Sequence, residues 1–448
     1  MMKTPIYDFA KAYTEKKGLR LHMPGHKGIS RLGCEALDIT EIDGADNLYK
    51  AEGIILESEK NASSLFGSLR TFYSAEGSSH CIRAMLYLIK RRATDLGISP
   101  KILAGRNAHK TFISAAALLD VDVDWLYGEE SSYLSCLIKP EELDRILSSY
   151  EKKPSAVYLT SPDYLGNIAD VESLSQVCHR HGVILAVDNA HGAYLKFLSK
   201  SLHPLDLGAD VCCDSAHKTL PVLTGGAYLH VSKNAPEVFA SEAKDALSLF
   251  GSTSPSYLIM QSLDLANEYI SSGYAEKLRC FCESAAELKS ELSSFGYKLI
   301  GDEPTKITLF AKAFGYLGTE LAEEIAKRGG MSEFYDPDFV VLMLSPELDV
   351  TKVKNILLGI SRKDAILSPA PSLPHPQRAL TPHDAIMSAS EELDTDSCLG
   401  RILASVSVSC PPAIPVVVCG EVIDRSSIEA LKYYGIEKCR VIKQGILC

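Results

Sequence analysis

The chain is poor in the features that mark membrane proteins and nucleic-acid-binding proteins. A membrane-spanning helix needs roughly 18 or more consecutive apolar residues, and no stretch of the chain reaches that length. Lysine and arginine together number 46 against 57 aspartate and glutamate residues, which gives a formal net charge of −11. That balance provides no basic surface for nucleic acids or anionic lipids. We therefore expect a protein that binds neither membranes nor nucleic acids.

The 13 cysteines lack the patterns of disulfide frameworks and metal sites. Their number is odd, and no Cys-x-x-Cys pair or other metal-type spacing occurs. Reduced thiols in a cytoplasmic protein, with no metal site, are the simplest interpretation. The first residues, Met1 to Asp8, also lack the apolar run of a signal peptide.

Short apolar strands alternate with amphipathic helices through the first half of the chain. This alternation predicts an α/β fold with a mainly parallel sheet that is sandwiched by helices. The predicted strands between residues 101 and 230 are Lys101–Ala104, Val121–Leu126, Ser155–Thr160, Val183–Val187, Val211–Cys213 and Ala227–His230.

The 448 residues are enough for two or three domains. We expect an N-terminal helix and loop segment at 1–50, a large sheet domain at 51–250 and a smaller α/β domain at 251–367. Residues 368–448 are predicted to form a linker and a small C-terminal module. The stretch Ser368–His383 contains five prolines in sixteen residues, which is typical of a linker.

Lys218 lies in the most informative stretch of the sequence, Asp210–Leu220. The predicted strand Val211–Cys213 is followed at once by a polar cluster that includes Ser215 and His217. A lysine at the carboxyl end of such a strand stands where α/β folds bind ligands. Together with serine and histidine it suits a Schiff base to pyridoxal phosphate (PLP), with its neighbours holding the phosphate. A solvated lysine on a surface loop is the alternative.

A second informative stretch, Ser74–Ser79, contains Gly77, Ser78 and Ser79. It stands between the predicted strand Thr71–Tyr73 and the predicted helix His80–Arg92. Free backbone N–H groups, two hydroxyls and the positive end of a helix dipole would form a phosphate site here. An ordinary helix N-cap is the alternative.

Six polar residues, three of them in the Lys218 stretch, lie at or just beyond the ends of the predicted strands. In an α/β sheet that edge binds ligands, so a group of polar side chains there indicates a site more strongly than any single residue does. These residues are His109, Ser161, Asp188, Ser215, His217 and Lys218.

Seven stretches together resemble the Orn/Lys/Arg decarboxylase family of PLP enzymes, in the order in which that family carries them. The resemblance implies the aspartate-aminotransferase fold, which is fold type I of the PLP-dependent transferases. The chain is similar to a short form of the family, which lacks the N-terminal wing domain and resembles arginine decarboxylases. The matching stretches are Leu-His-Met-Pro-Gly-His-Lys-Gly (21–28), Gly-Ser-Ser (77–79), Arg-Asn-Ala-His-Lys (106–110), Asp-Asn-Ala-His-Gly-Ala-Tyr (188–194), Ser-Ala-His-Lys-Thr-Leu (215–220), Ser-Thr-Ser-Pro-Ser-Tyr (252–257) and Pro-Pro-Ala-Ile-Pro (411–415).

The resemblance also implies roles. Lys218 would form the Schiff base, Asp188 would pair with the pyridine nitrogen, and His109 would stack on the ring. Thr253 or Ser254 would reach the phosphate of a neighbouring subunit, which implies a homodimer or a higher even oligomer. The remaining cofactor-binding residues implied by the family are Gly77, Ser78, Ser79, Ser161, His191, Ser215 and His217, and Glu333 would line the mouth of the site.

The implied reaction is decarboxylation of a basic amino acid on the route to polyamines. Arginine, giving agmatine and CO2, is the favoured substrate, with lysine and ornithine as alternatives. Glu76, Asp163 and Asp214 depart from the family pattern. As carboxylates near the cofactor they could favour a cationic substrate, or they could equally mark a divergent subgroup with another substrate. Two alternatives stay open: a PLP-dependent aminotransferase or lyase, and a non-catalytic regulatory homologue. The presence of both Lys218 and Asp188 argues against the second.

Overall fold

A computed structural model of the chain, which describes residues 2–128, 132–405 and 414–444, contains a seven-stranded sheet. Its strands are β1 (Arg70–Ser74), β2 (Lys101–Gly105), β3 (Asp122–Leu126), β4 (Ala156–Thr160), β5 (Ile184–Asp188), β6 (Val211–Asp214) and β7 (Ala227–Val231). Their order is β1-β7-β6-β5-β4-β2-β3. β5 pairs with β6 in parallel, as β2 does with β3, whereas β7 runs antiparallel to both β6 and β1.

The sheet confirms the predicted α/β fold. Each strand predicted between residues 101 and 230 is present, with its ends within two residues of the prediction. All five residues of β5 are buried, as expected for a parallel strand that is covered on both faces.

The chain divides into two compact units. The first consists of Met1–Ser99, Leu147–Tyr158 and Val171–Leu278, and the second of Pro100–Ile146, Leu159–Asp170 and Arg279–Cys448. Strand β4 has residues in both. The four segments predicted from the sequence stay a prediction.

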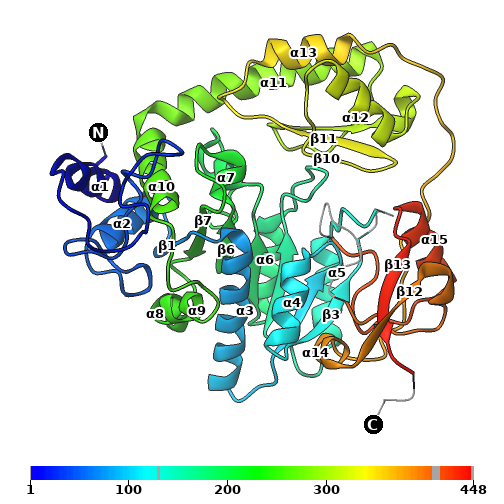
Figure 1. The fold of residues 1–448 in the computed structure, drawn as a ribbon. Coiled ribbons are helices and arrows are strands. Elements are labelled where there is room, and N and C mark those ends of the chain that lie inside the picture. Colours follow the sequence, from blue (N-terminus) through cyan, green and yellow to red (C-terminus); the bar gives the residue numbers. More distant parts are fainter. Residues whose placement is uncertain (1, 129–131, 406–413, 445–448) are drawn as a thin grey trace. The chain divides into compact units, whose positions relative to one another are not determined.

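The first unit surrounds β1, β5, β6 and β7 with helices (Figure 1). These are α1 (Pro5–Glu15), α2 (Ile54–Phe66), α3 (Gly77–Asp95), α6 (Val171–Arg180), α7 (Ala216–Thr219), α8 (Glu237–Ser241), α9 (Ala243–Ser248) and α10 (Tyr257–Tyr269), with the 3-10 turns η1 (Leu48–Lys50) and η2 (Ala193–Phe197) and the π-turn η3 (Ile270–Tyr274).

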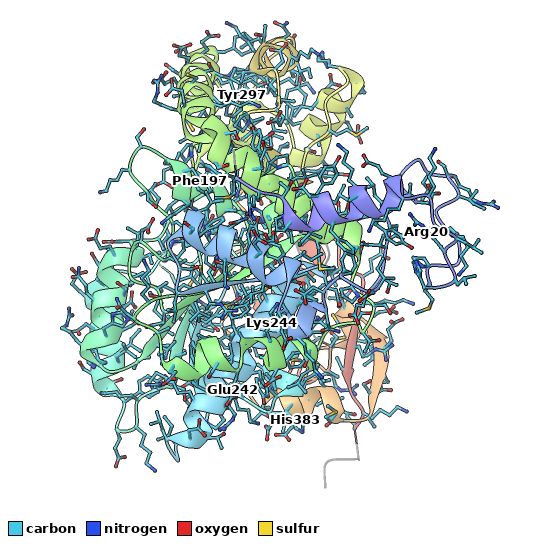
Figure 2. All side chains as sticks on the ribbon, turned by 90° about the vertical axis from the view of Figure 1, so that its left-hand side faces the viewer. Arg20, Phe197, Glu242, Lys244, Tyr297 and His383 are labelled. Carbon is cyan, nitrogen blue, oxygen red and sulfur yellow. The ribbon has the colours of Figure 1, made fainter. Side chains whose placement is uncertain are left out.

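Helix α1 packs against α2 and α10. Its apolar residues Ile6 and Ala10 are fully buried. The Asp264 carboxylate on α10 accepts the backbone N–H groups of Ile6 and Tyr7, which stabilises the N-terminus of α1. Elsewhere in this unit Phe197 packs edge-on against Phe66, with ring centroids 5.3 Å apart (Figure 2).

The second unit contains a four-stranded antiparallel sheet in the order β10-β11-β9-β8 and a two-stranded antiparallel sheet of β12 and β13. In its core Tyr297, labelled in Figure 2, stacks on Phe314 with ring centroids 3.8 Å apart. The strands are β8 (Leu299–Ile300), β9 (Lys306–Phe310), β10 (Phe334–Tyr335), β11 (Phe339–Met343), β12 (Ser390–Asp394) and β13 (Lys438–Ile442). The helices are α4 (Lys110–Leu118), α5 (Pro140–Ser149), α11 (Ala275–Phe295), α12 (Gly318–Lys327), α13 (Val350–Leu358), α14 (Pro382–Met387) and α15 (Arg425–Tyr433), with 3-10 turns η4 (Ala311–Phe314) and η5 (Thr395–Ser397); α5 and α11 each begin or end in the other unit.

Within the parts of the chain that the structure describes, none of the helices combines the length and the apolar character that a bilayer crossing requires.

Candidate active site

Lys218 and His191 meet at the edge of the sheet where β5 and β6 end. Lys218 Nζ lies 2.9 Å from His191 Nε2. The two strands run parallel, with Asp188 paired to Cys213, so the segments that follow them leave the sheet at the same edge. Lys218 is half-buried on the short helix α7, and His191 is buried. The sheet therefore brings together a primary amine and an imidazole from separate parts of the sequence.

A tight turn after β5 brings His191 to this place. The backbone N–H of Gly192 donates to the carbonyl of Asn189 at 2.8 Å, which closes the turn. A Cβ at Gly192 would lie only 2.0 Å from Asn189 Oδ1. A side chain does not fit there, and this explains why glycine follows His191 in the sequence.

Asp188 is the buried acid of the site, with 3% of its surface exposed. Its Oδ2 accepts the Tyr158 hydroxyl at 3.2 Å, and its Oδ1 accepts the Ala190 N–H at 3.2 Å. Burial raises the pKa of Asp188 above its ordinary value, although the positive charge of Lys218 opposes the shift. Because the nearest hydrogen-bond donors are neutral, the ionised carboxylate would gain from a further cation beside it.

Gly77, Ser78 and Ser79 form the first turn of α3 rather than a turn in front of it, which corrects the predicted helix start at His80. The helix begins earlier because the Gly77 N–H pairs with the carbonyl of Gly225 at 2.7 Å. Glu76 at the N-cap makes no side-chain capping hydrogen bond. A Cβ at Gly77 would meet no atom within 4 Å. An uncapped first turn beside open space is suited to an anion.

Ser215, at the end of β6, joins this helix terminus to the Lys218 segment. Its hydroxyl donates to Ser78 Oγ at 2.7 Å. His217, next to Lys218 on α7, donates from Nδ1 to the carbonyl of Gly226 at 3.0 Å. The predicted phosphate-binding residues Ser78 and Ser215 are therefore in contact.

Thr253 is exposed on the loop between α9 and α10. This loop is attached to the N-terminus of α3, because the N–H of Ser252 donates to Glu76 Oε1 at 2.6 Å. Glu76, one of the three departures from the family pattern, thus holds the loop that carries Thr253.

His109 and Ser161 belong to the second unit. His109 follows the turn after β2, and Ser161 follows β4 directly, as predicted. His109 is the N-cap of α4, and its Nδ1 accepts the backbone N–H of Thr111 at 3.2 Å. When the ring is neutral, its proton is therefore on Nε2. Ser161 follows β4, and its hydroxyl oxygen accepts the Ala169 N–H at 3.1 Å. Glu333, in the same unit, is exposed, and its carboxylate lies 3.5 Å from the Tyr164 hydroxyl.

Asp214 cannot contact a substrate, contrary to the expectation that it tunes the pocket. It is fully buried. Its Oδ2 accepts Nε2–H groups from His203 at 3.0 Å and His230 at 3.1 Å, and its Oδ1 accepts the Asn189 amide at 2.6 Å. Burial alone would raise the pKa of Asp214, but the two histidines more than offset this and lower it well below its ordinary value.

Asp163 is also buried, and its side chain accepts the backbone N–H and the side-chain amide of Asn167 at 2.9 and 2.8 Å. Burial raises the pKa of this carboxyl. Both oxygens therefore serve the turn that follows β4.

Sequence reasoning missed four residues that surround these carboxylates. Tyr158 and Cys213 contact Asp188, and His203 and His230 contact Asp214. The departure at Asp214 was the available signal, since a buried acid needs donors. The segment Pro-Pro-Ala-Ile-Pro, which supported the family resemblance, lies outside the described residues at 411–413, whereas Ile414 and Pro415 are described.

Comparisons with known proteins identify the family and the fold. Residues 4–312 match the family model of the Orn/Lys/Arg decarboxylase major domain. An uncharacterised protein of Bacillus subtilis, YaaO, is 28% identical over 96% of this chain and 94% of its own length. An arginine decarboxylase of Halalkalibacterium halodurans is 25% identical over 96% of this chain and 93% of its own. Lysine decarboxylase A from Pseudomonas aeruginosa has the same fold, with a TM-score of 0.80 at 17% identity over 98% of this chain and 80% of that one.

The fold is that of the type I PLP enzymes. The chain belongs to the Orn/Lys/Arg decarboxylase family and is a PLP-dependent amino acid decarboxylase.

Proposed function

We propose that this member of the Orn/Lys/Arg decarboxylase family binds PLP through Lys218 and converts arginine to agmatine and CO2. The observation that carries the proposal is the pair Lys218 Nζ and His191 Nε2, 2.9 Å apart, at the strand end that also carries the buried Asp188. The finer choice of arginine over lysine or ornithine rests on the relatives named arginine decarboxylase.

The residues at this edge fit PLP. The cofactor supplies an aldehyde that condenses with amines and a protonated ring that accepts electrons from a breaking bond. Asp188 is a buried carboxylate with neutral donors around it, so a protonated pyridine nitrogen would supply the cation that stabilises its ionised form. The uncapped first turn of α3, with the hydroxyls of Ser78 and Ser215 in contact, suits the phosphate.

His191 and Lys218 provide the proton chemistry. A lysine attacks an aldehyde only as the free amine. His191 Nε2 accepts a hydrogen bond from Lys218 Nζ at 2.9 Å, so a base stands within reach of the proton that the amine must lose. The same two groups can return a proton to the substrate carbon after CO2 leaves.

We also propose a homodimer or a higher even oligomer in the cytoplasm. Thr253 is exposed in the single chain, where it could contribute to the site of a second subunit. The cysteines that the structure describes are all free thiols, as expected in a reducing compartment. His109, Ser161 and His191 are proposed to bind the cofactor as well.

Release of CO2 from the PLP-loaded protein, with arginine, lysine and ornithine offered separately, tests the proposal. We expect release from arginine, and none from any of the three with Lys218→Ala. Release from lysine or ornithine instead would show that this amino acid, and not arginine, is the substrate. No release from any, with the visible absorbance of bound PLP intact, would point to a different PLP reaction at the same residues.

A further inference from the structure

Arg106 lies in the connection between β2 and α4. Its charged side chain is buried against residues 415–421 near the C-terminus. Its guanidinium donates to the carbonyls of Pro415 at 3.0 Å and Val416 at 2.9 Å. It also pairs with Glu421 Oε2 at 3.2 Å, and both side chains are 2% exposed. All of these residues belong to the second unit.

The segment 414–419 needs such a partner because it is buried without regular structure. Val416 and Val417 are fully buried, yet the segment forms neither a helix nor a strand. Buried carbonyls outside helices and sheets must find donors elsewhere. The flat fork of a guanidinium can serve two carbonyls and a carboxylate at once, which a lysine ammonium cannot do with the same geometry.

Glu421 holds the other side of this contact. Besides Arg106, its Oε2 accepts the backbone N–H of Val418 at 2.6 Å and so closes the turn between them. Gly420, within that turn, has a φ of +92°, and a Cβ there would lie 2.4 Å from the Leu380 carbonyl oxygen. The turn is thus fixed by close packing as well as by the ion pair.

The contact lies three residues before His109. The N–H of Arg106 donates to the Leu126 carbonyl at 2.9 Å, and that of Ala108 donates to the Gly105 carbonyl at 3.0 Å. Arg106, Asn107 and Ala108 are all at least 97% buried. Because the connection is short and packed on all sides, a displacement of Arg106 moves the N-cap of α4, where the His109 ring is held.

Two further contacts attach the C-terminal part of the chain to the same region. Arg378 donates to the Val123 carbonyl on β3 at 2.7 Å. His383, labelled in Figure 2, donates to the Ala117 carbonyl on α4 at 2.8 Å. Figure 1 shows α14 beside α4. These contacts place α4 between the strands that it connects, β2 and β3, and the C-terminal module.

We propose that Arg106 and Glu421 are positioning residues. Their contact, called the brace below, holds the β2–α4 connection against the segment 414–421 and thereby sets the orientation of His109 for the cofactor. The role of His109 toward PLP rests on the proposed function. The brace itself does not, and it can be measured in cofactor-free protein.

The protein contains a natural reporter of the brace. Trp125 on β3 is the single tryptophan of the chain, and the Arg106 guanidinium carbon lies 5.4 Å from the centroid of its ring. Tryptophan fluorescence therefore reports on the surroundings of Arg106 without any background from other tryptophans.

The experiment compares Glu421→Gln and Arg106→Lys with the control Glu391→Gln. Glu391 belongs to the same module and pairs with Arg401 at 2.7 Å, and among the described residues no hydrogen bond or ion pair joins either of them to Arg106. In cofactor-free protein we expect both brace variants to shift the Trp125 emission and to change the rate of diethylpyrocarbonate labelling at His109. The rate at His179 should stay the same, and the control should match the wild type in both measurements.

A double-mutant cycle then asks whether the brace acts through His109. We expect each brace variant to weaken PLP binding on the order of tenfold, the cost of a displaced positioning group, but to cause no further loss in a His109→Ala background. Additive losses, or unchanged labelling of His109, would overturn the proposal. If the wild type binds no PLP, the proposed function fails, and the cofactor-free measurements still decide whether the brace exists.

Discussion

Asp188 and Asp214 end neighbouring parallel strands of one sheet, yet their surroundings move their pKa values in opposite directions. Burial raises the pKa of Asp188, whose donors are a phenol, a backbone N–H and a thiol. At Asp214 burial alone would raise the pKa, but the two histidines outweigh it and lower the pKa. The chain supplies every partner that Asp214 needs, whereas Asp188 gains from a cation that the protein only partly provides. A strand-end acid is thus a candidate for function when the fold leaves it incompletely satisfied.

Removing the lysine beside Asp188 should have the largest effect on turnover. With Lys218→Ala we expect turnover to fall on the order of 10³-fold or more, since the covalent attachment point and its proton are both lost. The visible absorbance of lysine-bound PLP should disappear as well. Steady-state kinetics and absorbance spectra measure the two effects, and normal turnover in this variant would refute the assignment of Lys218.

Asp188→Asn should separate function from stability. We expect turnover to fall on the order of 10²-fold, because the ring nitrogen loses its anionic partner. The free energy of unfolding of the cofactor-free protein should show a dependence on pH that the variant lacks. A carboxyl whose pKa is raised by folding favours the folded state at low pH, and this contribution is lost as the pH rises through the folded pKa.

Urea unfolding of the cofactor-free protein at pH 5 and pH 8 checks the second part. The asparagine variant should lose less stability than the wild type between these two values. A variant that is equally active, or one that is less stable than the wild type only at pH 8, would contradict the account of Asp188.

His191→Asn should have a smaller effect than either change. The asparagine can still hydrogen-bond near Lys218, but it offers no base at 2.9 Å. We expect turnover to fall by about tenfold to a hundredfold, as for loss of a general base, and the acidic limb of the pH–rate profile to change. A profile that overlays that of the wild type would mean that His191 moves no proton.

Asp214→Asn should have the smallest effect on turnover and a large one on stability. The asparagine leaves at least one of the buried donors of His203, His230 and Asn189 without its acceptor, and each such donor costs about 1–3 kcal/mol of the free energy of unfolding. A carboxyl whose pKa is lowered by folding stabilises the protein above its unfolded pKa of about 3.9, and that contribution is lost as the pH falls toward the folded pKa.

The difference in stability between wild type and Asp214→Asn should therefore shrink between pH 5 and pH 3. Urea unfolding at both values measures it, and His179→Asn, which removes an imidazole from the pair with the buried Asp210, serves as the matched control. A difference that stays constant with pH would show that Asp214 is not the anion described here.

The sequence was sufficient to predict the sheet and to place Lys218 and Asp188 at the ends of its strands, because parallel strands end at one edge whatever their order. His191 was named only through the family resemblance. The sequence could not predict that Tyr158 reaches Asp188, which depends on β4 lying next to β5. The sequence showed Asp214 only as a departure from the family pattern before Ser215, one of three carboxylates that could favour a cationic substrate. Its partners His203 and His230 come from a loop and a strand that only the folded chain brings together.

The same limit applies to Arg106. The sequence places it in a family-like stretch, Arg-Asn-Ala-His-Lys, but its partners lie about 310 residues later in the chain. A contact of such separation leaves no periodic signal in the sequence. The start of α3 was missed by three residues for a related reason, since a backbone contact with Gly225 fixes it.

The measurement that tests the central claim most directly is borohydride reduction of the PLP-loaded protein, followed by peptide mass spectrometry. Reduction fixes the cofactor to the amine that holds it. We predict a single modified peptide, with the pyridoxyl group on Lys218. A group on a different lysine, or no modified peptide from protein that retains PLP, would contradict the assignment of the site.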